Sequence, residues 1–242
     1  MKKILSVLLV LCIAATLFAA TGVTVKVGSA FAFFNEKTAK FDDTYHSYER
    51  FKGHGFGFDA EVQYDISDKL LVFASYGKVF PSDAYMMTCD DDSPNTKWNS
   101  IYEDLVYEGL ERKLKINFMD ITAGVAYKFD FNAFKLAVGC GIAFNRLMIK
   151  ATFTPEVNHD DPYTETLKYT LSNFAVIGYA EAKYLVAENV GITLTAKPQL
   201  NFYSFYNYYC KSHDDPDVLN EKYKGIALGF AMPVALGVSY SF

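Results

Sequence analysis

The stretch GIALGFAMPVALGVSYSF, residues 225–242, decides the fold of this chain. It carries no charged residue and is long enough to cross a bilayer as a helix. Its glycines, Pro233 and the polar Ser239 and Ser241 suit a helix poorly. Apolar residues instead occupy every second position: Leu228, Phe230, Met232, Val234, Leu236, Val238, Tyr240 and Phe242. A period of two belongs to a β-strand, so this segment is predicted to be a strand with one apolar face.

The same alternation recurs upstream. In residues 56–65 the apolar residues Phe56, Phe58 and Val62 alternate with residues that include Asp59 and Glu61. The sequence predicts eight such strands, at about 22–35, 55–65, 69–80, 116–129, 134–150, 169–185, 190–206 and 225–242. Most of them have the ~9 to 11 residues that a tilted membrane strand needs. The segment at 69–80 is apolar on both faces, so the pattern leaves its orientation open.

The connections between these segments fall into two classes that alternate along the chain. Three are tight and polar, at 66–69, 130–133 and 186–189. Four are long and hydrophilic, at 36–54, 81–115, 151–168 and 207–224. Bacterial outer-membrane barrels have this layout, with short periplasmic turns and long extracellular loops. The sequence therefore predicts an all-β fold, an eight-stranded antiparallel transmembrane up-and-down β-barrel.

Composition and the N-terminus fit an exported barrel. Hydrophobic residues make up 51% and aromatic residues 17% of the chain, and the formal net charge is −5, which disfavours a nucleic-acid partner. The mean hydropathy of +0.04 is too low for a bundle of membrane helices. Residues 1–20 have a basic start, an apolar core and small residues at the end, which is typical of a cleavable signal peptide. A lipoprotein acylated at Cys12 and an uncleaved anchor are the alternatives. We expect residues 21–242 to form one barrel domain in the outer membrane of a diderm bacterium.

The C-terminal residues carry a family resemblance. A chain that ends in Phe242, with Tyr240 and Val238 at alternate positions, resembles the assembly signal of bacterial outer-membrane barrels. Over residues 21–242 the chain resembles the small eight-stranded barrels of the OmpX, OmpW and OmpA membrane-domain kind. The resemblance implies a monomer that contacts outer-membrane lipid, the barrel-assembly machinery and periplasmic chaperones.

Charged residues are expected inside the barrel. Nine alternate with the apolar outward positions: Lys26, Asp59, Glu61, Asp120, Lys128, Lys135, Glu181, Lys183 and Lys197. An eight-stranded barrel has an interior just wide enough for side chains to fill. We therefore expect a network of ion pairs that plugs the lumen, and the alternative is a narrow path between small inward residues.

The long loops hold the other candidate sites. Acidic clusters occur in each loop, and two of them repeat a His-Asp-Asp-Pro motif. These motifs supply candidate ligands for a divalent cation: His159, Asp160, Asp161, His213, Asp214 and Asp215. Asp-Pro turns without any ligand are the alternative explanation. Cys89 and Cys210 are candidates for a disulfide between two loops. No cofactor is predicted.

Three functions are consistent with this sequence. The first is a surface-interaction barrel of the adhesin type, whose acidic loops contact a host or envelope protein. The second is a narrow, porin-like channel for ions or small solutes. The third is an envelope enzyme acting on lipid or peptide, with residues such as His46 and Ser47 or Ser212 and His213. Adjacent residues in a loop rarely reach catalytic geometry, so no enzymatic activity is predicted and the first function is favoured.

Overall fold

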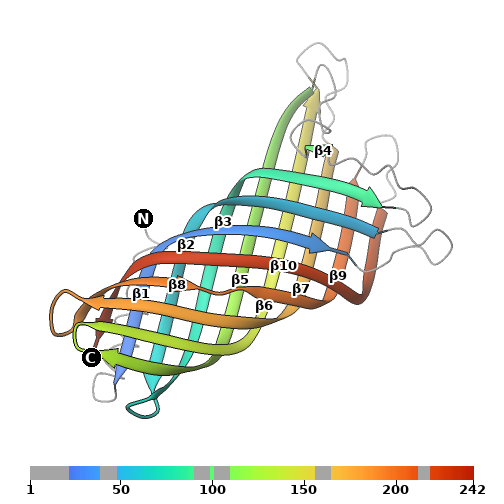
Figure 1. The fold of residues 1–242 in the computed structure, drawn as a ribbon. Helices are drawn as coiled ribbons and strands as arrows, with labels where there is room; N and C mark the ends of the chain where they lie inside the picture. The colour runs from blue at the N-terminus through green and yellow to red at the C-terminus, as the bar shows by residue number, and fades with distance from the viewer. Residues whose placement is uncertain (1–21, 39–47, 90–98, 101–109, 156–164, 212–218) are drawn as a thin grey trace.

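The computed structural model describes residues 22–38, 48–89, 99–100, 110–155, 165–211 and 219–242. These residues form one antiparallel sheet (Figure 1). Its strands are β1 (Val23–Lys37), β2 (Tyr48–Asp65), β3 (Leu70–Cys89), β4 (Asn99–Ser100), β5 (Leu110–Phe131), β6 (Phe134–Pro155), β7 (Glu165–Leu185), β8 (Val190–Ala196), β9 (Gln199–Lys211) and β10 (Leu219–Ser241). Among the described residues, no helix has the length and hydropathy required to cross a membrane.

The sheet closes into a ring because β1 pairs with β10, from Thr24 opposite Ser241 to Asn35 opposite Phe230. Strands β8 and β9 together occupy one strand position of the barrel, since both lie between β7 and β10. They are separated at Lys197 and Pro198, where the proline has no N–H to donate. Strand β4 is a short addition beside β3. The ring therefore has eight strand positions, which confirms the predicted eight-stranded barrel.

The three tight turns lie at one end of the barrel, where the sequence predicts the periplasmic side. Between β5 and β6 the turn consists of two residues, and Asn132 has a positive φ of 56°. Asparagine tolerates this left-handed conformation better than most residues because its short polar side chain bonds locally. Ile66 and Val186 begin the other two turns and donate backbone hydrogen bonds to Leu70 and Val190.

Several strands are longer than the sequence pattern predicts. Strand β2 begins at Tyr48 and β3 continues to Cys89, and both ranges were expected to be loop. Cross-strand pairing sustains these extensions beyond the membrane, as between β5 and β6, which pair from Phe131–Phe134 to Leu110–Pro155. The connections at this end are therefore shorter than expected.

The outward face of the ring is apolar. Phe56, Ile142 and Leu228 are 69%, 67% and 66% exposed. Val125 on β5 and Val138 on β6 are exposed on the same face. Exposing an apolar surface of this size to water is unfavourable, whereas exposing it to lipid hydrocarbon is not. The band therefore matches the lipid-facing band of a membrane barrel.

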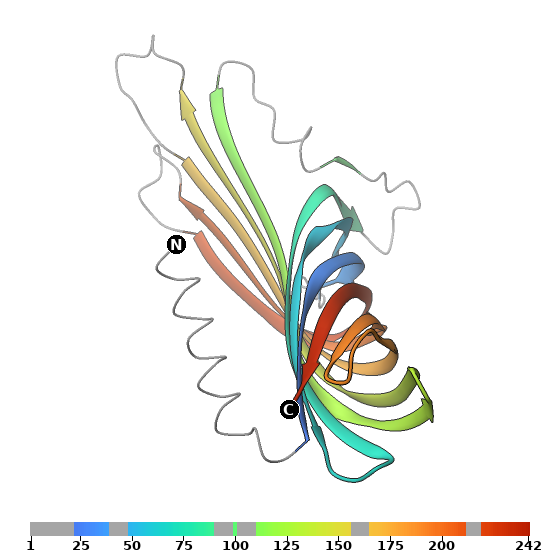
Figure 2. The same cartoon turned by 90° about the vertical axis from the view of Figure 1, so that its left-hand side faces the viewer.

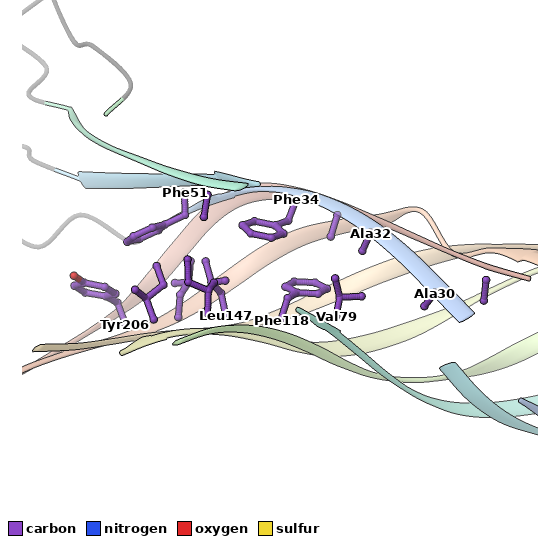
Figure 3. Close-up of a cluster of buried hydrophobic side chains, with 14 residues drawn as sticks. Ala30, Ala32, Phe34, Phe51, Val79, Phe118, Leu147 and Tyr206 are labelled. Carbon is purple, nitrogen blue, oxygen red and sulfur yellow. The ribbon is translucent and has the colours of Figure 1, made fainter. Parts of the chain in front are cut away.

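The orientation of β3, which the pattern left open, is set by two apolar clusters inside the barrel. Leu71 and Phe73 face inward and join Ala126, Ala137, Ala143, Ala175, Ile177 and Tyr179, which we call the lower apolar cluster. Val79 faces inward in the upper apolar cluster, with Ala30, Ala32, Phe34, Phe51, Ala84, Ile116, Phe118, Leu147, Ile149, Leu171, Tyr206, Ala231 and Ala235. Figure 3 shows Phe34 and Phe51 on one side of the upper cluster and Phe118, Leu147 and Tyr206 on the other.

The ring opens at its outer end on one side. The ladder between β3 and β5 runs from Leu70–Tyr127 to Val79–Phe118. Among the described residues, β3 beyond this point pairs with β2 and β4, and β5 pairs with β6. Figure 2 shows the outer ends of β5, β6 and β7 (green to orange) separating from those of β1, β2 and β3 (blue to teal). We call the place where the two walls part the β3–β5 seam.

Candidate functional site

Five charged side chains meet in the middle of the lumen, and we call them the central ion network: Lys26, Asp59, Glu61, Glu181 and Lys197. Lys26 Nζ lies 2.5 Å from Glu61 Oε1 and also contacts Glu181 Oε2. Glu61 lies opposite Lys26 on the neighbouring strand, whereas Glu181 belongs to β7. Lys26 therefore connects two walls of the barrel that are not adjacent.

Lys197 makes the second crossing of the lumen. It lies between β8 and β9, and its Nζ is 2.8 Å from Asp59 Oδ2 and 3.0 Å from Glu61 Oε2, both on β2. The same ammonium donates to Ser75 Oγ at 2.7 Å. Only 1% of Lys197 is exposed, so its charge is compensated by these carboxylates and not by water.

Neutral side chains complete this network. The Tyr179 hydroxyl lies 2.8 Å from Glu61 Oε1 and 2.6 Å from Glu181 Oε2. Gln63 Nε2 donates to Glu181 Oε2 at 2.8 Å and to Glu61 Oε1 at 3.0 Å. The ring of Tyr179 stacks on Phe73 at 4.1 Å, which joins the network to the lower apolar cluster. The two carboxylates are thus held by several partners at once.

The strand register and two glycines make room for the buried acidic side chains. Glu61 and Lys26 are direct cross-strand neighbours, and Asp59 lies opposite Gly28, which has no side chain. Gly77 faces Asp120 in the ladder between β3 and β5. A Cβ on Gly77 would overlap Asp120 Oδ1, so a larger residue there would require this carboxylate to shift.

A second polar group lies nearer the outer end and was not predicted from the sequence. This amide cluster consists of Glu36, Asn145, Asn173, Gln199 and Asn201. Glu36 Oε2 accepts hydrogen bonds from Asn173, at 2.9 Å, and from Asn201. Glu36 was expected in the first loop, but β1 continues through it and buries it completely. The alternation that starts at Lys26 reaches Glu36 without a break, and this signal could have located it.

The remaining residues predicted for the lumen lie at different depths. Asp120 is buried beside the central ion network, and Lys183 donates to Ser241 Oγ at 3.0 Å. Lys128 and Lys135 face the lumen side only at the rim formed by the tight turns. There Lys128 pairs with Asp65 at 2.8 Å and Lys135 with Asp130 at 3.3 Å. These two rim pairs are partly exposed.

Other predicted residues lie outside the lumen. Val238, Tyr240 and Phe242 point outward at the end of β10, with 57%, 45% and 40% exposure. The metal candidates His159, Asp160, Asp161, His213, Asp214 and Asp215 fall outside the described residues, as do the catalytic alternatives in the loops. Among described residues, no group of three metal-ligating side chains occurs. Cys89 and Cys210 lie on β3 and β9, four walls apart in the ring, and their pairing stays a prediction.

This arrangement fills the barrel by layers. Rim pairs lie at the end with the tight turns, the central ion network follows, and the amide cluster and the upper apolar cluster close the outer half. A buried ion pair needs its partners in place, because water does not replace them at these depths. The interior therefore fastens the walls to one another across the lumen.

Comparisons with known proteins address the fold. No protein-family model matches the chain, and no curated protein sequence matches it. Solved structures do match. A major outer membrane protein from Thermus thermophilus is similar with a TM-score of 0.57 at 15% identity, over 91% of this chain and 99% of that one. The outer membrane protease OmpT from Escherichia coli gives a TM-score of 0.50 at 9% identity, over 91% and 97%.

A third similar structure is the outer membrane protein OprG from Pseudomonas aeruginosa, with a TM-score of 0.49 at 10% identity, over 92% of this chain and 96% of that one. At these identities the likeness concerns the fold, and it carries no catalytic or transport property to this chain. The closed ring, the outward apolar band and the likeness to the Thermus thermophilus protein identify the chain as a small eight-stranded β-barrel of the outer-membrane type.

Proposed function

We propose that this protein is a closed membrane anchor that holds its outer connecting segments at the cell surface, where they contact a host or envelope protein. The observation that carries the proposal is the central ion network, which crosses the lumen twice through Lys26 and Lys197. A barrel whose lumen is filled in this way does not serve as a pore. It instead holds the outer connecting segments at the membrane surface.

The length of the strands supports the same proposal. Strands β5 and β6 have 22 residues each, and β7 has 21. About 9 to 11 residues suffice for a tilted membrane strand. The paired strands thus continue well beyond the bilayer and raise the connecting segments above it. A scaffold of paired strands positions a surface segment more firmly than a long flexible loop does.

The sequence of the connecting segments indicates the charge of the partner. Acidic runs occur in all of them, as in Asp90, Asp91 and Asp92 and in the two His-Asp-Asp-Pro motifs. A surface with this excess of negative charge attracts cations and basic protein surfaces and repels anionic polymers. The proposed partner therefore presents a basic surface, and no catalytic step is part of the proposal.

Planar-bilayer recording tests the closed anchor. The refolded residues 21–242, shown to be folded by heat-dependent migration on a gel, are expected to give no discrete conductance steps. Steps that change in amplitude in Glu181→Gln and stay unchanged in the rim variant Lys135→Gln would overturn the proposal and establish a path through the lumen.

Surface contact is tested separately with proteoliposomes of phosphatidylcholine. We expect them to be retained on a poly-lysine surface, and to lose several-fold retention when Asp90, Asp91 and Asp92 are replaced by Asn. The matched control replaces Asp65, Asp68 and Asp130, which lie at the opposite end of the barrel. Equal loss in both variants would show that net charge, and not the outer segments, controls retention.

The β3–β5 seam favours a second candidate function. Val79 and Phe118 form the last pair of the ladder, and the inward residues beside it, including Ile116 and Ala84, are apolar. A small apolar solute that enters the barrel here would leave sideways into lipid without passing the central ion network. Uptake of such a solute into vesicles, increased in Phe118→Ala and unchanged in Glu181→Gln, would favour this route over the closed anchor.

A further inference from the structure

The outward face changes character abruptly at the outer end of the apolar band. From the level of the outer aromatic residues outward, every charged side chain that the described part of this face presents is basic. We call this set the basic collar: Lys37, Arg50, Lys52, Lys115, Arg146, Lys150, Lys168, Lys222 and Lys224. The collar follows the strands around the ring, from β1 and β2 through β5, β6 and β7 to β10.

The collar is densest over β6, β7, β9 and β10, where it lines two surface cavities. The first has a volume of about 520 Å³ and is lined by Arg146, Lys168, Lys222 and Lys224, with Thr170 and Ser172 between them. The second has a volume of about 470 Å³ and shares Lys168 with the first. Lys150, the direct cross-strand partner of Lys168, also lines it. Both have room for a phosphate-sized group and its neighbours, and neither has a carboxylate among its described lining residues.

The neighbours of these cavities fix their height relative to the bilayer. Phe205 lines the first cavity and lies 5.9 Å from Phe174, which in turn lies 5.5 Å from Phe144. These rings form the outer aromatic girdle, which marks the boundary between hydrocarbon and headgroups. Arg146 follows Phe144 by two residues on the same face, a rise of about 7 Å along the strand. The cavities therefore lie at the level of the lipid headgroups.

We propose that these two cavities bind the phosphate groups of outer-leaflet lipid headgroups. Arginine binds phosphate through two parallel hydrogen bonds and lysine binds it as a point charge. The hydroxyls of Thr170 and Ser172 add neutral donors between the cations. The acyl chains of the same lipid lie against the apolar residues below, of which Ile226 is 84% exposed two residues from Lys224. One lipid molecule thus satisfies both the charged cavity and the apolar band.

Native mass spectrometry of the detergent-solubilised, folded barrel tests this inference. The probes are diphosphorylated lipid A and its dephosphorylated form, and inorganic phosphate serves as competitor. We expect the phosphorylated lipid to be retained and the dephosphorylated one to be released. The double variant Lys222→Gln with Lys224→Gln is expected to weaken retention by about fivefold for each lysine removed.

The matched control is Lys69→Gln with Lys135→Gln, which removes the same charge at the opposite rim and is expected to leave retention unchanged. Heat-dependent gel migration checks that all variants are folded. Equal weakening by both pairs, or equal retention of the dephosphorylated lipid, would overturn the proposed site. Full displacement by inorganic phosphate would overturn its assignment to lipid, because a soluble anion would then suffice.

Discussion

Lys197, like Lys26, is a buried lysine of the lumen that contacts two buried carboxylates. Its ammonium contacts Asp59 and Glu61, and removing it leaves both carboxylates buried with less compensation. The cost of breaking a buried ion pair comes from the charge left behind, since that charge cannot regain its hydration. Salt bridges at the rim differ, because water replaces a lost partner there.

The substitution Lys197→Met is therefore expected to lower the free energy of unfolding by about 3 to 5 kcal/mol. Lys135→Met is its control, since the pair of Lys135 with Asp130 is about half exposed, and it is expected to cost less than about 1 kcal/mol. Denaturant titration of the refolded barrels, followed by circular dichroism, measures both. Similar costs for the two variants would contradict a fastening role for Lys197.

Much of the interior follows from the sequence at the residue level, and the exceptions have physical causes. Alternation places Lys26, Asp59 and Glu61 inward, and the structure does so. It does not show which carboxylate Lys26 reaches, because Glu181 is a neighbour only across the lumen. Glu36 was missed because a charged residue followed by a polar stretch resembles a loop, whereas cross-strand pairing keeps β1 extended to Lys37.

At the level of the strand, the turn between β5 and β6 depends on one backbone conformation. Asn132 has a φ of 56°, where a β-branched residue is strained. We expect Asn132→Val to lower the free energy of unfolding by about 1 to 2 kcal/mol, and Asn132→Gly to change it little. The same denaturant titration measures this. A loss in the glycine variant as large as in the valine variant would show that the Asn side chain matters, and not the conformation.

Depth along one strand gives a second prediction. Val125 and Asn117 share the outward face of β5, but Val125 lies within the apolar band and Asn117 beside the basic collar. Val125→Arg is expected to cost about 2 to 4 kcal/mol in vesicles and Asn117→Arg about 0 to 1 kcal/mol. Unfolding in phosphatidylcholine vesicles compares them. Equal costs would place the bilayer elsewhere along the strand.

The strands themselves were more predictable than their ends. Each expected segment coincides with part or all of a described strand, or with the pair β8 and β9, and the tight turns lie where polar residues interrupt the alternation. Pro198 divides segment 190–206 into β8 and β9. The backbone still pairs with both neighbouring strands there, because Lys197 donates to Pro233 and Pro198 accepts from Gly178. The outer ends were predicted too short because their pairing continues into solvent, where the apolar pattern fades.

For the whole molecule, closure of the ring depends on the first and last strands of the chain, which pair with each other. Thr24 Oγ1 lies 2.9 Å from Ser241 Oγ, and Val25 lies opposite Tyr240. Deleting residues 238–242 is expected to reduce the folded, heat-modifiable fraction several-fold, because β1 loses its partner at that end and two strand edges face lipid. Phe242→Ala keeps the backbone pairing and serves as the control when both variants are refolded in detergent, where no assembly machinery reads the C-terminal residues. A deletion variant that folds as well as the control would show that closure does not need this segment.

Pairing of the first strand with the last also sets the rate at which the barrel is lost. The ladder between β1 and β10 joins the first and last strands of the barrel, and its formation ends the exposure of free edges. Reversing it requires many hydrogen bonds to break in hydrocarbon before any water can replace them. We therefore expect a slow unfolding step, and not equilibrium stability alone, to set how long this protein persists in the membrane.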